Sequence, residues 1–149
     1  DKTDRKILSL LQADGRMTNA ELAQRINLSP SACLRRVQRL EESAVIAGYV
    51  ALVRQEAVGR PTSIFVEVTL KSQSEESLKA FERAVRACPD IMECYLMSGD
   101  ADYLIRVVAA DTQDYERIHK QHLTRLPGVA RIRSSFALRA ISKKTALDI

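Results

Sequence analysis

Three arginines stand close together in the first third of the chain, at Arg35, Arg36 and Arg39, and no acidic residue follows until Glu41. A guanidinium group is always charged in proteins, and its N–H donors fit phosphate oxygens and the major-groove edge of guanine. Spacings of three and four residues bring such groups to one side of a helix. The cluster therefore indicates a surface for nucleic acid, with a solvated basic helix face as the plainer alternative.

The residues around these arginines have the pattern of a helix-turn-helix. Thr18 and Glu21 have the spacing of a capping box, and the small Ala23 would let a neighbouring helix cross closely. Asn27 suits the turn because asparagine tolerates a positive φ. Ser29 is a favourable N-cap for the basic helix, with proline at the next position. These features together favour DNA binding through Ser29, Ser31, Ala32, Arg35, Arg36 and Arg39.

Apolar residues at helical spacing predict that residues 1–50 hold three short helices. Their inward stripes are Ile7, Leu10 and Leu11, then Leu22, Ala23 and Ile26, then Cys33, Val37 and Leu40. A β-prone run over residues 45–53 predicts a linking strand, and Gly59 and Pro61 indicate a hinge. We therefore predict a (winged-)helix-turn-helix domain over residues 1–50 and a linker strand with a hinge over residues 51–61.

From residue 62 the apolar period changes from helical to alternating, as in Ile64, Val66, Val68 and Leu70. The pattern predicts the order strand, helix, strand, strand, helix, strand, which is the ferredoxin-like βαββαβ arrangement of an α+β fold. We assign it to residues 62–149. The expected strands are 62–70, 91–97, 103–109 and 129–140, and the expected helices are 74–87 and 111–126.

Two helices can cover only one face of such a sheet. Keeping the alternation, the other face would hold Phe65, Tyr95, Met97, Leu104 and Val108. This set is too apolar to face solvent, so a homodimer through sheet faces or edges is the simplest account.

Composition sets the broad class of protein. Hydrophobic residues make up 46% of the chain and charged residues 28%, which is typical of a folded protein, and the net charge is +4. Residues 1–60 hold ten Lys and Arg against seven Asp and Glu, whereas residues 61–149 hold thirteen against twelve. No apolar run is long enough to span a membrane. Three cysteines in apolar contexts indicate reduced thiols, and hence the cytoplasm.

Two histidines and two acids raise the alternative of a catalytic or metal site. His119 and His122 are three residues apart and could share a metal, but no third ligand has suitable spacing. Packed or surface histidines are the better interpretation, so we expect no metal site. Asp100 and Asp102 lie in the turn 98–102, which on its residues alone reads as a polar hairpin turn.

The whole chain resembles the Lrp/AsnC regulators, the "feast/famine" transcription factors of bacteria and archaea. The resemblance rests on four stretches: DKTDRKILSLLQADGRMTNAELAQRINLS, SPSACLRRVQRLEESAVIAGYVA, SGDADYLIRV and LPGVARIRSSF. It implies an N-terminal helix-turn-helix, a C-terminal ferredoxin-like RAM domain, and dimers that assemble to tetramers or octamers. It also implies an amino-acid effector, bound between the RAM domains of adjacent dimers around the turn matching Ser98 to Tyr103.

The resemblance implies a role for this turn in effector binding. Gly99 would let the backbone approach a ligand, and Asp100 and Asp102 could pair with an α-ammonium group. The expected effector residues are Met97, Ser98, Gly99, Asp100, Asp102, Tyr103, Ser134, Ser135 and Phe136.

The function expected is therefore that of a sequence-specific transcriptional regulator of amino-acid metabolism, which binds double-stranded DNA and a free amino acid and needs no cofactor. Two alternatives stay open. One is a small amino-acid-metabolism enzyme with His119, His122, Asp100 and Asp102 as candidate catalysts. The other is an amino-acid-binding oligomer whose helix-turn-helix makes only protein contacts.

Overall fold

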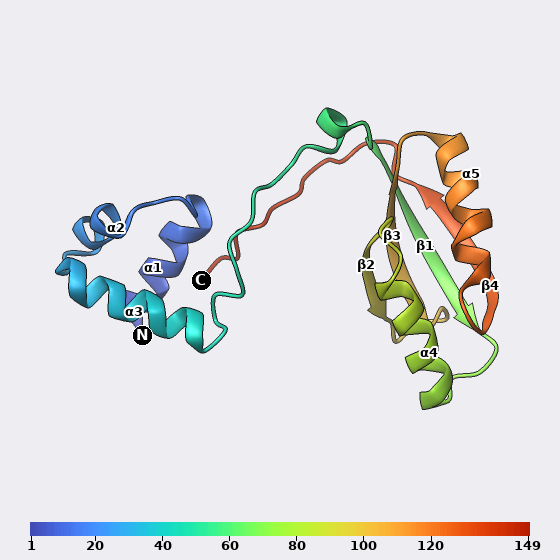
Figure 1. The fold of residues 1–149 in the computed structure, drawn as a ribbon, viewed down its shortest axis with the longest axis horizontal. Helices are drawn as coiled ribbons and strands as arrows, with labels where there is room; N and C mark the ends of the chain where they lie inside the picture. The colour runs from blue at the N-terminus through green and yellow to red at the C-terminus, as the bar shows by residue number, and fades with distance from the viewer. The chain divides into compact units, whose positions relative to one another are not determined.

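The computed structural model describes residues 1–149, which form two compact units. The first consists of Asp1–Leu52 together with Ile141–Ile149, and the second of Val53–Ala140. The first is helical and the second is built on a sheet (Figure 1). Our sequence boundary placed the last nine residues with the sheet, whereas they lie with the helices. There the Gln12 side-chain amide donates to the Leu147 carbonyl and accepts from its N–H.

Three helices make up the first unit, as predicted: α1 (Lys2–Ala13), α2 (Asn19–Ile26) and α3 (Pro30–Glu42). Each begins at a side chain that accepts a backbone N–H, namely Asp1, Thr18 and Ser29. The capping box is half formed, because Glu21 pairs with Arg25 instead of reaching back. The predicted stripes meet in one core, in which the buried residues are Ile7, Leu22, Ala23, Ile26, Cys33 and Leu40.

Two residues other than glycine in this unit have a positive φ. Asn27 ends α2 in the left-handed region at φ 57°, as its place in the turn predicts. Ala44 lies just beyond α3 at φ 59°, which no feature of the sequence predicts. Around it the Ile46 N–H donates to the Leu40 carbonyl at 3.0 Å, so the chain reverses tightly after α3.

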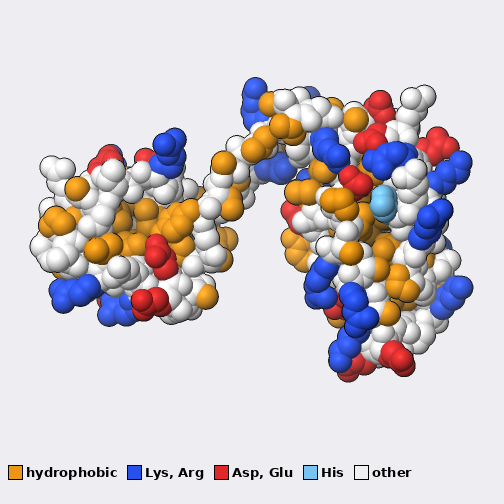
Figure 2. All heavy atoms as spheres, viewed as in Figure 1, with side chains coloured by type: hydrophobic (Ala, Val, Ile, Leu, Met, Phe, Trp, Pro, Cys, Tyr) orange, Lys and Arg blue, Asp and Glu red, His pale blue; other side chains and the backbone are white.

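The linking strand predicted over residues 45–53 is absent from this chain. No strand lies beside this run, so its backbone has no ladder to join, and residues 51–54 have no regular structure until the short helix η1 (Gln55–Val58). Val50 and Leu52 are 81% and 72% exposed. Figure 2 shows such apolar side chains at the surface of this segment.

The second unit confirms the predicted βαββαβ order. Its strands are β1 (Thr62–Leu70), β2 (Ile91–Leu96), β3 (Tyr103–Ala109) and β4 (Val129–Phe136), and its helices are α4 (Glu75–Arg86), α5 (Thr112–Gln121) and the short η2 (Leu123–Arg125). The sheet is antiparallel, in the order β2-β3-β1-β4. Both α4 and α5 lie on the same face of it (Figure 1). This is a ferredoxin-like fold.

The alternation in β1 fixes which face is buried. Ile64, Val66 and Val68 are 0% exposed and pack with Phe81 of α4 and Ile118 of α5. On the other face Phe65 is 40% exposed and Leu104 is half-buried.

The structure corrects three details of the predicted second unit. The helix α5 ends at Gln121 rather than at Leu126, and β4 ends at Phe136 rather than at Ala140. Val108, placed among the open-face apolar residues, is buried. Separately, none of the helices is long and apolar enough to traverse a lipid bilayer.

Candidate DNA-binding face and effector site

The predicted DNA-binding residues lie around the free side of α3. A hollow of about 350 Å³ is lined by four of the six, Ala32, Arg35, Arg36 and Arg39, together with Leu28. Capping by Ser29 and the left-handed turn at Asn27 set the direction in which α3 leaves α2. A hydrogen bond also joins α2 to α3, because the Asn19 side-chain amide donates to the Pro30 carbonyl at 2.9 Å.

The three arginines differ in their surroundings. The Arg36 guanidinium lies 3.0 Å from Asp1 Oδ2 and 2.9 Å from Asp4 Oδ1, and Arg39 lies 3.9 Å from Asp4 Oδ2. Arg35 is exposed and forms no ion pair. Arg36 is therefore occupied in holding α3 against the start of α1, and Arg35 is the arginine whose charge is uncompensated.

The small residues at the start of α3 also have local roles. The Ser29 hydroxyl accepts the Ala32 N–H and lies 3.3 Å from the Ser31 hydroxyl. Gln38 is exposed and lies three residues after Arg35, on the same side of the helix as Ser31. Sequence reasoning followed charge and left Gln38 out, whereas helical spacing from Arg35 places it on this side of α3.

The turn between β2 and β3 is fixed by Asp102. Its carboxylate accepts the Leu70 N–H at 2.7 Å and the Gln73 amide at 3.2 Å, and its own N–H donates to the Val68 carbonyl. These bonds lie where the register of β1 shifts between Thr69 and Leu70. Asp102 therefore holds the turn to the end of β1, and this role was missing from the sequence interpretation.

Asp100 lies instead beside a polar hollow of about 350 Å³. The residues that line it are Glu67, Thr69, Asp100, Ala101, Arg131 and Arg133. Glu67 and Arg133 are direct partners across β1 and β4, and their charged ends are 3.9 Å apart. The hollow thus combines carboxylates that can hold an ammonium group with guanidinium groups that can hold a carboxylate. Sequence reasoning missed the β4 arginines, although their spacing of two signals one shared face.

Tyr103, a predicted effector residue, faces the helices. It is 1% exposed, its ring lies 4.5 Å from that of Phe81 between ring centres at a tilt of 32°, and its hydroxyl donates to Glu82 at 2.5 Å. Burial and this carboxylate hold the pKa of its phenol well above the usual range. Tyr103 therefore lies on the opposite face of the sheet from the residues that form the polar hollow.

The predicted residues of β4 also lie away from the turn within one chain. Ser134 bonds to the Tyr115 hydroxyl, and Phe136 meets the Tyr115 ring edge-on at 5.3 Å, so both face α5. Phe136 pairs with Ile64, whereas Tyr103 pairs with Val68. Four residues of strand correspond to roughly 13 Å.

The remaining predicted effector residues are divided in the same way. Ser135 is paired with Phe65 and shares the open face. Met97, Ser98 and Gly99 are exposed at the turn. The single chain thus gathers the turn residues in one place and separates them from residues 134–136.

The histidines belong to other contacts. His119 lies edge-on to Tyr115, and His122 Nε2 lies 4.0 Å from the buried Asp90 carboxylate, which also pairs with Arg60 at 2.7 Å. No three His, Cys, Asp or Glu side chains come together in a way that could hold a metal ion.

Comparison with known proteins gives the same order of two domains, although the match to the second domain extends over residues 141–147, which lie with the helices in the structure. The family model described as winged helix-turn-helix DNA-binding matches residues 1–46, and that described as the Lrp/AsnC ligand binding domain matches residues 63–147. The chain is 42% identical over 146 residues to the Bkd operon transcriptional regulator of Pseudomonas aeruginosa, covering 98% of this chain and 95% of that protein. It is 39% identical to the leucine-responsive regulatory protein of Escherichia coli, covering 100% of this chain and 91% of that protein.

Solved structures agree with these sequence relatives. A transcriptional regulator from Neisseria meningitidis, solved as a complex with L-Met, matches with a TM-score of 0.93 and 36% identity, covering 99% of this chain and 96% of that one. An AsnC family transcriptional regulator from Agrobacterium tumefaciens matches with a TM-score of 0.94 and 38% identity, with the same coverage. With the helix-turn-helix, the ferredoxin-like unit and these full-length relatives in agreement, the chain belongs to the Lrp/AsnC family of transcriptional regulators.

Proposed function

We propose that α3 is the helix with which this regulator reads DNA, and that Arg35 is its main contact residue. The observation that carries the proposal is the difference among the arginines: Arg35 has no acidic partner, whereas Arg36 and Arg39 face Asp4. Ser31, on the same side as Arg35, and Arg39 would add phosphate or base contacts. Arg36 and Ser29 would act through position, by fixing α3 for the others.

The DNA-binding residues would work in pairs, because one short helix reads only a half-site. The half-exposed aromatic residues Phe65 and Tyr95 on the open sheet face, at 40% and 54% exposure, support a homodimer through this face. Two α3 helices would then read a pseudo-palindrome with half-sites about one helical turn apart. In this arrangement residues 1–50 serve DNA and residues 51–61 connect. Residues 62–140 serve assembly and effector binding, with dimers joining further into tetramers or octamers, while residues 141–149 pack with the helical unit.

The effector would be a free amino acid held in the polar hollow beside Asp100. Its ammonium group would face Asp100 and Glu67, and its carboxylate would face Arg131 and Arg133, which line the same hollow. The L-Met complex of the Neisseria meningitidis relative supports this class of ligand. Met97, Ser98 and Gly99 at the turn, and Ser134, Ser135 and Phe136 from a neighbouring copy, would complete the site.

Regulation would follow if the amino acid binds one assembly state more tightly than another. Such a ligand shifts the population of that state by its difference in affinity, and DNA affinity changes with it. No cofactor is part of this proposal. The three unpaired thiols Cys33, Cys88 and Cys94 fit the reducing cytoplasm, where we place the protein.

The test uses DNA that the protein itself selects from a random-sequence pool. Binding is followed by fluorescence anisotropy at fixed salt, with each of the twenty amino acids present in turn. We expect Arg35→Ala to weaken binding, and we expect Asp100→Ala to leave binding intact while abolishing the response to the amino acid. Arg125→Ala, at an exposed position outside both regions, is the matched control. Unchanged selected-site binding by Arg35→Ala would overturn the DNA assignment.

The enzyme alternative has its own test. Incubating the protein with the amino acids that alter its melting temperature, followed by product analysis, would detect turnover. We expect unaltered amino acids; a product that disappears with His119→Ala or His122→Ala would replace the regulator proposal with a catalytic one.

A further inference from the structure

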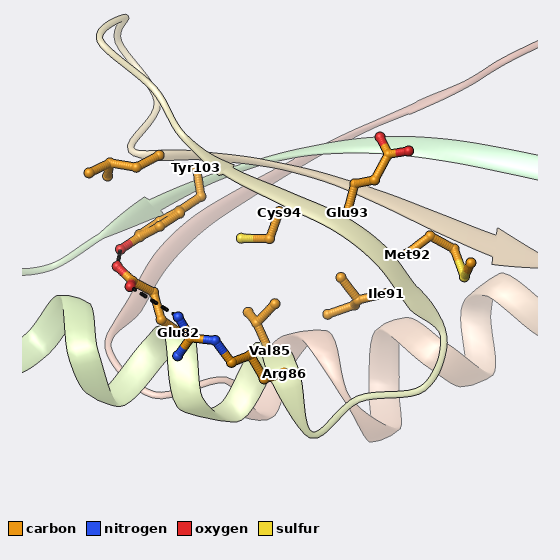
Figure 3. Close-up of a pocket in the computed structure, with 9 residues that line it drawn as sticks. Glu82, Val85, Arg86, Ile91, Met92, Glu93, Cys94 and Tyr103 are labelled. Atoms are coloured by element: carbon orange, nitrogen blue, oxygen red, sulfur yellow. Dashed lines mark hydrogen bonds and ion pairs between the residues drawn. The ribbon is translucent and has the colours of Figure 1, made fainter. Parts of the chain in front are cut away.

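A second hollow lies on the other face of the sheet from Asp100, between α4 and β2, and has a volume of about 470 Å³ (Figure 3). This volume is in the range of small-molecule sites. The residues that line it are Glu82, Val85, Arg86, Ile91, Met92, Glu93, Cys94, Leu96 and Tyr103. It shares no residue with the polar hollow beside Asp100.

The floor of this hollow is apolar. In Figure 3, Val85 of α4 and Ile91 and Cys94 of β2 point into the space between the helix and the strand. Val85 is only 5% exposed, and Cys94 is half-buried. Burial is the main cause that raises the pKa of the Cys94 thiol to about 11, and the nearby Glu82 carboxylate adds to it. The Cys94 side chain is therefore uncharged at physiological pH. Such a floor fits a branched or thioether side chain.

One end of the hollow carries both signs of charge. Glu82 accepts the Tyr103 hydroxyl through Oε2, and its Oε1 lies 3.9 Å from Arg86 Nη2. A carboxylate has room for further donors, so Glu82 can also accept from an ammonium group. Arg86 is 76% exposed in its side chain and can turn its guanidinium toward a carboxylate.

The strand beside the hollow adds backbone groups. β2 is an edge strand, because the sheet order is β2-β3-β1-β4, and its outer side has no neighbouring strand. Such an edge presents N–H and C=O groups in a row. These groups can serve the two charged ends of a small zwitterion beside the apolar floor.

We propose that the hollow between α4 and β2 is a second binding site for a free amino acid with an aliphatic or thioether side chain. Glu82 takes the ammonium group, Arg86 takes the carboxylate, and Val85, Ile91 and Cys94 receive the side chain. The site goes beyond the proposed effector hollow and gives the chain two amino-acid sites on opposite faces of one sheet.

Cys94 gives a direct measurement of occupancy. Alkylation by iodoacetamide at about pH 9 is followed for each cysteine by mass spectrometry, with L-leucine or L-methionine present or absent. At ten times its Kd a ligand fills about nine tenths of the sites, so alkylation of Cys94 should slow about tenfold. Cys33 and Cys88, which are buried elsewhere, are internal controls whose rates should not change. Protection of Cys94 by neither amino acid would overturn the proposal.

Ligand analogues test the charge assignment. 4-Methylpentanoate lacks the ammonium group of leucine, and 3-methylbutylamine lacks its carboxylate. Both should fail to protect Cys94 at concentrations where L-leucine protects. Equal protection by either analogue would show that the hollow takes apolar molecules in general, and the amino-acid assignment would be wrong.

Variants separate this site from the one beside Asp100. Arg86→Glu should abolish protection of Cys94, whereas Arg83→Glu, an exposed change on the same helix outside the hollow, should not. Asp100→Ala should remove the effector response and leave Cys94 protection intact. Protection lost with Asp100→Ala and kept with Arg86→Glu would overturn this inference and leave the proposed function standing. A different result would overturn only the proposed effector hollow. In that case the amino acid protects Cys94 in the unmodified protein, but it does not change the affinity for DNA.

Discussion

The Arg36 guanidinium lies 2.9 Å from the Asp4 carboxylate, so a residue of the predicted DNA-binding face binds to the first turn of α1. The contact joins two residues that are 32 positions apart in sequence, and the Asp4 side chain is only 18% exposed. Removing one partner of a partly buried pair costs more than removing one partner of a fully solvated pair, because the remaining charge is left uncompensated. Arg36 is therefore a positioning residue for α3.

The first prediction contrasts neighbouring arginines. Arg36→Ala should lower the free energy of unfolding by about 1 kcal/mol, because it leaves Asp4 without its partner. Arg35→Ala should change the free energy of unfolding by less than about 0.5 kcal/mol. In DNA binding the order reverses, and Arg35→Ala should reduce the slope of log affinity against log salt by about 1 if it contacts a phosphate. Urea unfolding and salt-dependent anisotropy measure the two effects. Equal stability losses in both variants would contradict the division of roles.

The second prediction concerns the two acids of the β2–β3 turn. Asp102→Ala should lower the free energy of unfolding by about 1–3 kcal/mol, because the Leu70 N–H loses its acceptor. Asp100→Ala, which removes no hydrogen bond found in the structure, should change it by less than about 0.5 kcal/mol. Thermal unfolding without added amino acid provides the measurement. A large loss in Asp100→Ala would show that this residue serves the fold.

The third prediction concerns Ala44, whose φ of 59° is unfavourable for any residue with a Cβ. The left-handed region costs about 1–2 kcal/mol for such residues, and the greater freedom of glycine in the unfolded chain offsets part of the gain. Ala44→Gly should therefore raise the free energy of unfolding by about 0.5–1 kcal/mol. Chemical denaturation of the two proteins side by side measures the difference. Ala47→Gly, in the same segment without a positive φ, should give no gain.

The fourth prediction concerns acid stability. The Ala110 N–H and the Arg117 guanidinium, at 2.8 and 2.9 Å, lower the pKa of Asp114 below its ordinary value of 3.8. As pH falls, Asp114 therefore becomes protonated at a higher pH in the unfolded chain than in the folded protein. The stabilisation is fully present above about pH 4 and is lost as pH falls through the folded pKa.

Melting temperature measured between pH 2 and pH 6 tests this prediction. Asp114→Asn should show a flatter decline below about pH 4 than the unmodified protein, because the variant has no such proton to take up. Asp148→Asn, at an exposed position near the end of the chain, is the control and should keep the original decline. Identical curves for Asp114→Asn and the unmodified protein would contradict the assignment.

Local patterns predicted the elements well because each has a local cause. The helix starts followed from Thr18 and Ser29, the turn from Asn27, and the buried face of β1 from its alternation. The strand expected over residues 45–53 failed because a strand needs a neighbour, and sequence alone does not supply one. Residues 134–136 and the turn were assigned to one site by family resemblance, which carries no information about distances within a single chain.

The candidate sites were harder to predict for a similar reason. Charge identified the arginines of α3, but only the fold shows that Asp4 approaches two of them. Asp100 and Asp102 look alike in sequence, yet one lines a hollow and the other holds the end of β1. The hollow between α4 and β2 combines residues up to 21 positions apart, whose proximity no short motif records.

The pairing of Arg36 with Asp1 and Asp4, and the approach of Arg39 to Asp4, would bear on how the protein searches a chromosome. Affinity for arbitrary sequence grows with the number of phosphates that a protein neutralises, and a genome offers at least about a million such sites. A proposed reading helix with one uncompensated arginine would spend less time bound at wrong positions than a helix with three. If α3 reads DNA as proposed, Asp1 and Asp4 would favour release from wrong sequences, and residence at the right one would depend on several copies binding together.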